Sequence, residues 1–339
     1  MHKERAVLPD VFRIILCIGV VVYHYVWPRP SSGPFMVNGF FVLSGFLIGV
    51  MFAGCESLNA ADFYSRKLRR LLPLFLVALL VGISYRIWSG TPWPDEYKPG
   101  CLGASYLLKH YNTPLWYMLV EGAFLLLVPF LYYLHRLKGG LSMGLLAVFA
   151  LGAWMFSHVP QNAPFGDDLY YYPPYRCWQF VLGIYAAGLY RQLRQLKPTV
   201  QGACKVLTAC LFALFVGVGV LLMFVEQKET LNYWNYTFEF DVITCLFFAL
   251  LIPCLFAFDW QFRNKWTERI NKAALLTYPV FLLHVPVFFF LCDVLEQADL
   301  YPPKAVNRIL ATILTLVVSV ALMRLERYCM GRFFPITKK

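Results

Sequence analysis

The sequence predicts an all-α, polytopic membrane protein with about ten transmembrane helices around a polar cavity. Its 339 residues are 59% hydrophobic and only 14% charged, whereas soluble chains carry about 25% charged and about 45–50% apolar residues. The mean hydropathy is +0.58. Apolar stretches recur along the whole chain, and basic residues alternate between the loops that join them. We therefore expect a single integral membrane domain over residues 1–339, with no appended soluble domain.

The apolar stretches approach the roughly 20 residues that a helix needs to cross a bilayer. The loops between them average roughly 13 residues, too few for a soluble catalytic domain or a nucleic-acid module. Any chemistry must therefore lie in the helix bundle and its short loops. The expected spans are Val7–Trp27, Phe35–Gly54, Leu71–Trp88, Pro114–Leu134, Leu141–Phe156, Tyr175–Tyr190, Val206–Val225, Phe238–Phe258, Ala273–Val294 and Ala305–Leu325.

The basic residues predict the orientation of the chain in the membrane. The formal net charge is +11, but in a membrane protein Lys and Arg are interpreted by loop, because cytoplasmic loops are rich in them. When Arg86, Arg308 and Arg324 near the span ends are counted with the adjoining loop or tail, the two tails and the even-numbered loops hold 21 of the 30, and the odd-numbered loops hold 7. This alternation predicts that both termini are cytoplasmic in the inner membrane. The excess of basic residues is thus explained by the orientation of the chain in the bilayer, and we expect no nucleic-acid partner.

Among the ionisable residues of the first span, Arg13 and His24 stand out. Charged groups inside a membrane are costly, so they are functional candidates that face the bundle interior. Their spacing of eleven residues places both on one helical face, about 16 Å apart along the axis. Asp10 is one turn from Arg13 and could pair with it. The alternative is a structural Asp10–Arg13 pair with His24 reaching to the outer interface.

Other spans carry further candidates. Glu121 in the fourth span needs a partner, and His24 or Arg176 could reach it if the helices adjoin. Glu239 and Asp241 are weaker candidates, because a solvated face would explain them. His284 lies near the middle of the ninth span, where a structural and a catalytic histidine are equally plausible.

The second inner loop is strongly basic. Its residues Arg66 and Arg69 share a helical face at the cytoplasmic surface. Arginine presents a planar fork of donors that suits phosphate oxygens. Contact with anionic lipid is the alternative interpretation of this segment.

Ordered blocks of residues run from the first span to the last: Leu8–Arg13 with His24, the segment Phe40–Leu47, the Arg-x-x-Arg segment Phe63–Arg70, Leu115–Trp116 to Glu121, Arg176–Gly183, Tyr278–His284 and Leu325–Glu326. Together these blocks resemble acyltransferase family 3, bacterial membrane acyltransferases that modify envelope glycans. Asn38 stands where many relatives carry an acidic residue, and Gly122 and Ala123 replace a polar pair.

This resemblance implies a reaction and a set of roles. The donor would be a cytoplasmic acyl-CoA, expected to be acetyl-CoA, and the acceptor a sugar hydroxyl of an envelope polysaccharide or glycolipid such as lipopolysaccharide. His24 would act as the general base. The resemblance also implies that Arg66 and Arg69 bind the coenzyme phosphates, with Arg13 one level deeper. Glu121 would orient His24 or the acceptor. The substrate would contact Trp116, Arg176, Ser44 and Asn38, and we expect no metal.

Two questions stay open at this point. Donor phosphates bound at the inner surface cannot adjoin His24, so either the pantetheine arm threads into the bundle or an acyl carrier step intervenes. Arg13 is too far from His24 to stabilise an oxyanion there unless the helix bends.

A proton-coupled transporter or a glycolipid flippase, with the buried groups relaying protons, is the alternative function. The sequence leaves the acceptor and the oligomeric state undetermined.

Overall fold

The computed structural model describes residues 7–26, 32–90, 108–136, 140–157, 170–224, 238–258 and 264–333. In these ranges the chain forms long α-helices and no strand. The helices are α1 (Leu8–Tyr25), α2 (Ser32–Ala53), α3 (Ala60–Ser89), α5 (Leu115–Arg136), α6 (Gly140–Ser157), α7 (Pro173–Arg194), α8 (Pro198–Phe224), α10 (Phe238–Ala257), α11 (Asn264–Gln297) and α12 (Lys304–Phe333).

The all-helical membrane fold predicted from the sequence is confirmed. Each expected span overlaps one of these helices, and eight helices in the described ranges are long and apolar enough to cross a membrane. Helices α6 and α7 are not among the eight. Helix α7 is polar because it carries buried groups such as Arg176 and Gln179, which other helices surround. Hydropathy alone therefore fails to identify such a central helix as a candidate membrane span.

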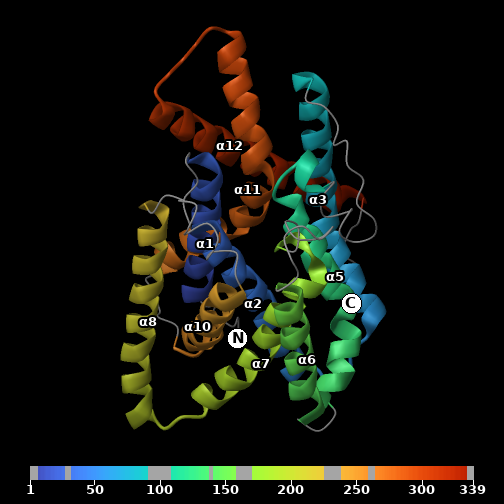
Figure 1. Cartoon of the computed structure of the whole chain (residues 1–339), viewed down its shortest axis with the longest axis vertical. Helices are drawn as coiled ribbons and strands as arrows, with labels where there is room; N and C mark the ends of the chain where they lie inside the picture. The colour runs from blue at the N-terminus through green and yellow to red at the C-terminus, as the bar shows by residue number, and fades with distance from the viewer. Residues whose placement is uncertain are drawn as a thin grey trace.

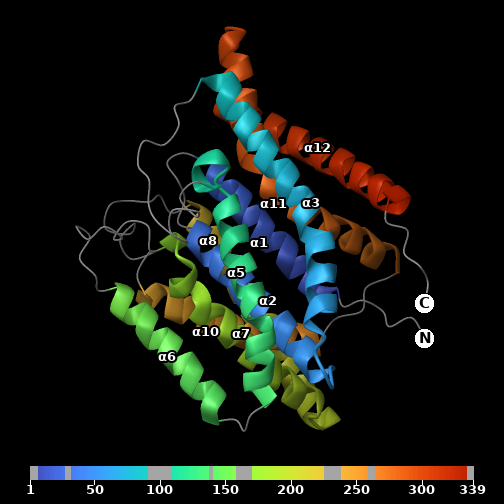
Figure 2. The ribbon, with the colours of Figure 1, turned by 90° about the vertical axis from the view of Figure 1, so that its right-hand side faces the viewer.

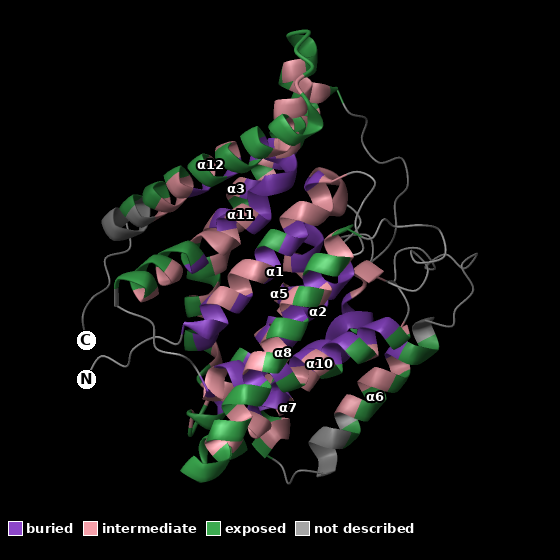
Figure 3. Cartoon of the chain, turned by 90° about the vertical axis from the view of Figure 1, so that its left-hand side faces the viewer, coloured by how far each residue is buried: buried purple, intermediate pink, exposed green. Residues whose placement is uncertain are grey.

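The helices form a buried centre with a lipid-facing periphery. Helices α1, α2, α7 and α10 meet in the middle of the molecule, while α8 stands at the left edge in Figure 1 and α12 crosses the upper part. In the most apolar part of α2, 72% of the residues are buried, whereas the corresponding share is 17% in each of α3, α8 and α12. Figure 3 shows this division by colour. Buried polar groups thus concentrate in the central helices.

Helices α2 and α7 pack backbone against backbone. A Cβ on Gly45 would overlap the carbonyl oxygen of Phe180, and one on Gly49 would lie 2.5 Å from the carbonyl oxygen of Ile184. A Cβ on Gly183 of α7 would in turn meet the backbone of Val42. Small residues four apart allow this approach, which is a common basis of helix association in membranes.

The close contact makes Gly45 sensitive to the smallest side chain. Gly45→Ala is expected to lower the free energy of unfolding by about 1–3 kcal/mol, because the two helices must separate. Unfolding in a denaturing-detergent titration measures the change. Gly217→Ala on α8 is the matched control, since a Cβ there meets nothing within 4 Å. Equal stability of the two variants would contradict the prediction.

Candidate functional site

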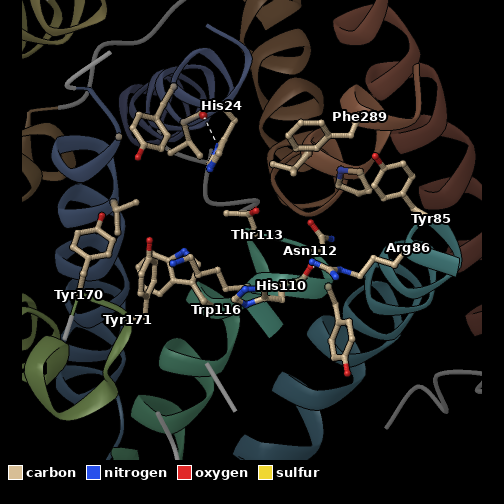
Figure 4. A pocket seen from close by; sticks show the side chains of 18 residues that line it. His24, Tyr85, Arg86, His110, Asn112, Thr113, Trp116, Tyr170, Tyr171 and Phe289 are labelled. Atoms are coloured by element: carbon tan, nitrogen blue, oxygen red, sulfur yellow. Dashed lines mark hydrogen bonds between the residues drawn. The ribbon is translucent and has the colours of Figure 1, made fainter. Parts of the chain in front are cut away.

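A cavity of about 400 Å³ opens at the end of the bundle where α1 ends and α5 begins. Figure 4 shows His24 and Phe289 on one side of it, across from Trp116 and His110. Its eighteen lining residues include the cations Arg86 and Lys109 and no Asp or Glu. The described wall is therefore aromatic and basic.

His24 reaches this cavity from the last turn of α1. Its Nδ1 lies 3.0 Å from the carbonyl oxygen of Val20 and 2.9 Å from Nε2 of His284. The partner comes from α11, 260 residues further along the chain. His24 thus has a buried imidazole as its neighbour.

His284 is fully buried, with 0% of its surface exposed. Its Nδ1 lies 3.1 Å from the carbonyl oxygen of Val280 and 2.8 Å from that of Phe281. Both acceptors belong to the preceding turn of its own helix. The structure therefore combines the two interpretations left open by the sequence: His284 is bonded to its helix, and it also contacts the candidate base.

Polar contacts hold α1 against α11 and α12 beside the two histidines. The hydroxyl of Tyr25 donates to the carbonyl oxygen of His284 at 3.1 Å and lies 3.0 Å from Oγ1 of Thr315. Arg308 donates from Nε to the carbonyl oxygen of Tyr25 at 3.1 Å. These bonds fix the end of α1, and with it the height of His24.

A proline in α11 creates a second attachment near the site. Pro286 has no backbone N–H, so the carbonyl of Leu282, four residues earlier, loses its helical partner. Asn112, on the turn before α5, donates from Nδ2 to this carbonyl at 2.8 Å and to that of Ala78 at 3.3 Å. One buried amide thereby ties α3, α5 and α11 together at the cavity wall.

Three aromatic side chains form one wall of the cavity. The ring of Trp116 lies 5.3 Å from that of Tyr170 and 5.0 Å from that of Tyr171. The two tyrosine rings are 5.2 Å apart. The Lys109 Nζ lies 3.9 Å from the Tyr171 ring centroid, a cation–π contact. Flat aromatic faces beside a cation can hold a sugar ring.

Arg176 lies behind this wall and does not line the cavity. It is fully buried and pairs with Asp241 of α10 at 2.9 Å. It also donates to Asn38 at 3.2 Å and to the carbonyl oxygen of Tyr170 at 2.9 Å. The expectation that a solvated face explains Asp241 is wrong, because only 1% of its side chain is exposed.

The rest of this buried network engages both carboxylate oxygens of Asp241. Asn38 donates to Oδ1 of Asp241 at 2.8 Å, and Tyr175 donates to Oδ2 at 3.0 Å. We call this network the Arg176 cluster; its members are Asn38, Tyr175, Arg176, Gln179, Asp241 and Thr244. Through the bond to Tyr170 it supports the aromatic wall. Glu239, by contrast, is exposed.

Glu121 has a different partner from the two that the sequence suggested. Its Oε1 accepts a hydrogen bond from Ser44 of α2, and its Oε2 is buried without a hydrogen-bond partner in the described structure. Lys67 of α3 interacts with it electrostatically. The expected pairing with His24 or Arg176 is wrong, because α5 presents Glu121 to α2 and α3 at this depth.

The register of α1 against α2 sets the depth of these groups. Tyr23 lies against Gly33, and Leu16 against Gly39, so residue numbers facing each other on the two helices sum to about 55. Ser44 therefore lies level with the Arg13 region, about 16 Å below the cavity by helical rise. The polar groups form two levels: His24 with His284, and Ser44 with Glu121 below them.

Arg13 lies at the lower level and pairs with Asp10 at 3.0 Å. This confirms that the two residues can form an ion pair one turn apart. Arg66 and Arg69, still further from the cavity on α3, are exposed, whereas Lys67 between them is partly buried and interacts electrostatically with Glu121. The basic segment therefore has two exposed arginines and one partly buried lysine.

Sequence reasoning missed several residues that the structure brings to the site. The contacts of Lys67 and Asn112 gave no local signal, because both depend on which helices adjoin. His284, by contrast, was already a candidate as an ionisable residue inside a span, with its role left open. Of the four residues expected to contact substrate, Trp116 lines the cavity, while Ser44, Asn38 and Arg176 do not. The described part of the chain contains no group of three His, Cys, Asp or Glu residues that could hold a metal ion.

Comparison with known proteins places this architecture in a family. The sequence profile described as "Acyltransferase domain" matches residues 8–324. A protein of Staphylococcus aureus strain COL, named "Putative O-acetyltransferase SACOL0978", is 24% identical over 323 residues, which cover 85% of this chain and 52% of that protein. No solved structure matches the chain.

The name of a second relative states the same activity. The O-acetyltransferase OatA of Staphylococcus aureus strain NCTC 8325 is 22% identical over 343 residues, covering 91% of this chain and 55% of that protein. The chain thus spans about half the length of the curated relatives it matches. Because the family profile extends from α1 to α12 and so includes both polar levels, the chain belongs to acyltransferase family 3.

Proposed function

We propose that the protein is a multi-pass O-acyltransferase of the inner membrane that moves an acetyl group from cytoplasmic acetyl-CoA to a sugar hydroxyl of an envelope polysaccharide or glycolipid. The observation that carries the proposal is the position of His24, which lines an aromatic cavity and is backed by a buried histidine. Family membership and the activity named for its relatives support it.

The cavity is the proposed acceptor site. The distribution of basic residues favours an orientation in which this end of the bundle faces away from the cytoplasm. Trp116, Tyr170 and Tyr171 offer faces on which a sugar ring can lie. A hydroxyl of the bound sugar would then face His24.

His24 would act as the general base. As the sugar oxygen attacks the thioester carbonyl carbon, its proton passes to Nε2 of His24. The carbon–sulfur bond then breaks, and the imidazolium returns the proton to the departing coenzyme A thiolate. A histidine suits both steps because its ordinary pKa of about 6.5 lies near working pH.

The exposed face of Arg66 and Arg69 is the proposed site for the coenzyme phosphates. Arg86 of the same helix lines the cavity, so helical rise places Arg69 about 26 Å and Arg66 about 30 Å from it. The acyl end of the donor would have to extend over this distance, past Arg13, Ser44 and Glu121, to reach His24. Alternatively, its acyl group would pass through a carrier step at the level of these three residues.

A transfer assay tests the proposal. Purified protein in lipid vesicles is incubated with acetyl-labelled acetyl-CoA and an envelope glycan fraction, and labelled ester is measured together with free thiol. We expect ester and thiol in equal amounts. Movement of glycan or protons across the vesicle membrane without ester would overturn the proposal and favour a transporter or flippase.

Loss of the basic face should affect donor binding more than chemistry. Arg66→Ala and Arg69→Ala are each expected to weaken acetyl-CoA binding about 10-fold or more, because each removes a charged phosphate contact. Equilibrium binding and the KM for acetyl-CoA measure the effect. Lys272→Ala is the matched control, since Lys272 is an exposed cation paired with Glu268 on α11. Unchanged donor affinity in the arginine variants would assign their face to lipid contact.

A further inference from the structure

We propose that His284 is a positioning residue that holds the proton of His24 on Nδ1 and so keeps the lone pair of His24 on Nε2. The inference rests on the proposed function, in which His24 is the base, and it assigns a role to a second histidine. It is carried by four short contacts between two imidazoles and three backbone carbonyls.

The contacts of His284 determine where its own proton lies. Its Nδ1 faces the carbonyl oxygens of Val280 and Phe281 at 3.1 and 2.8 Å. Carbonyl oxygens only accept hydrogen bonds, so this nitrogen must carry the proton. A neutral imidazole has one N–H, and Nε2 is then an acceptor. The ring is fully buried, and its polar contacts with the described residues include no carboxylate, which favours the neutral form.

The same reasoning extends to His24. Its Nδ1 faces two acceptors, the Nε2 of His284 at 2.9 Å and the carbonyl oxygen of Val20 at 3.0 Å. The proton of neutral His24 must therefore lie on Nδ1, where both acceptors share it. Its Nε2 consequently has the lone pair, which is the form that a general base requires.

This arrangement also supports the charged state of His24. When Nε2 takes up a proton, the bond from Nδ1 to His284 becomes charge-assisted and therefore stronger. The proton stays on His24, because His284 has its Nδ1 proton held by its own helix. A neutral histidine thus fixes the tautomer without competing for the proton. Tyr25 and Asn112 hold the backbone on either side in place.

Two substitutions separate this role from simple packing. His284→Phe keeps a ring but removes the acceptor, and kcat is expected to fall about 10- to 100-fold while the acceptor KM changes less than about threefold. His284→Gln offers an amide oxygen near the position of Nε2, and we expect it to retain kcat within about fivefold. Tyr132→Phe is the control: it removes a buried hydroxyl that donates to the carbonyl oxygen of Cys55 at 3.2 Å, away from the cavity, so it should lower thermal stability and leave kcat within about twofold.

Nuclear magnetic resonance of ¹⁵N-histidine-labelled protein reports the tautomer without any turnover. The His24 signals are assigned by their loss in His24→Gln. We expect wild-type His24 to be protonated at Nδ1 and the His284→Phe variant to contain both tautomers. Protonation of wild-type His24 at Nε2, or equal kcat values in the Phe and Gln variants, would overturn the inference. Absence of acetyl transfer by the wild type would instead overturn the proposed function, while the spectrum would still locate the proton.

Discussion

Replacement of His24 by glutamine is expected to lower the rate of acetyl transfer by about 10²- to 10⁴-fold. This is the contribution that a positioned general base makes to catalysis. Glutamine can still donate from its amide group to Val20 and His284, so the end of α1 should keep its place. Its amide has no basic nitrogen, however, and cannot take the proton of the sugar hydroxyl. Release of coenzyme A thiol that depends on the acceptor measures the rate.

A second histidine provides the control for this experiment. His135 lies at the far end of α5, where its ring contacts Phe52 at 5.7 Å, and it does not line the cavity. His135→Gln should transfer acetyl groups at the wild-type rate. Acetyl-CoA binding should be unchanged in both variants, because the proposed phosphate site is on α3. Near-normal turnover in His24→Gln would remove this residue from the mechanism.

Features that depend on one helix could be predicted from the sequence. Apolar stretches became helices because burial or lipid satisfies their side chains and the helix satisfies their backbone. The Asp10–Arg13 pair followed from a spacing of one turn. The eleven-residue spacing predicted that Arg13 and His24 share a face at two depths, and the register of α1 against α2 agrees with two polar levels.

Features that depend on which helices adjoin could not be predicted in the same way. Glu121 pairs with Ser44 because α5 packs near α2 at that depth, which no spacing within α5 reveals. His284 was harder to place, because α11 has 34 residues and extends beyond the cavity, so its depth could not be counted from the helix end. Arg176 and Asp241 did leave a usable signal. Each lies three residues inside the start of its helix, α7 and α10 respectively, and hence at a similar depth.

Because the two residues lie at a similar depth, they form a buried ion pair, and its disruption has the largest expected effect on stability. Asp241→Leu should lower the free energy of unfolding by about 3–5 kcal/mol, because it leaves the Arg176 charge buried without its counterion. The guanidinium already has one nitrogen, Nη2, without a hydrogen-bond partner in the described structure. Unfolding in a denaturing-detergent titration measures the loss. Glu239→Leu, two positions earlier on the same helix and exposed, should change stability by less than about 0.5 kcal/mol.

A double variant tests whether the unpaired charge is the cause. Arg176→Met removes the charge, so Asp241→Leu combined with Arg176→Met should be more stable than Asp241→Leu alone, as replacement of a whole buried pair by apolar residues often is. If the two losses simply add, the pair contributes through packing and not through charge. The double variant should still transfer acetyl groups more slowly, because Arg176 also holds the carbonyl of Tyr170 at 2.9 Å and thereby one face of the acceptor wall. Within the Arg176 cluster, the charge pair with Asp241 would then determine stability, whereas the bond to Tyr170 would determine the rate of catalysis.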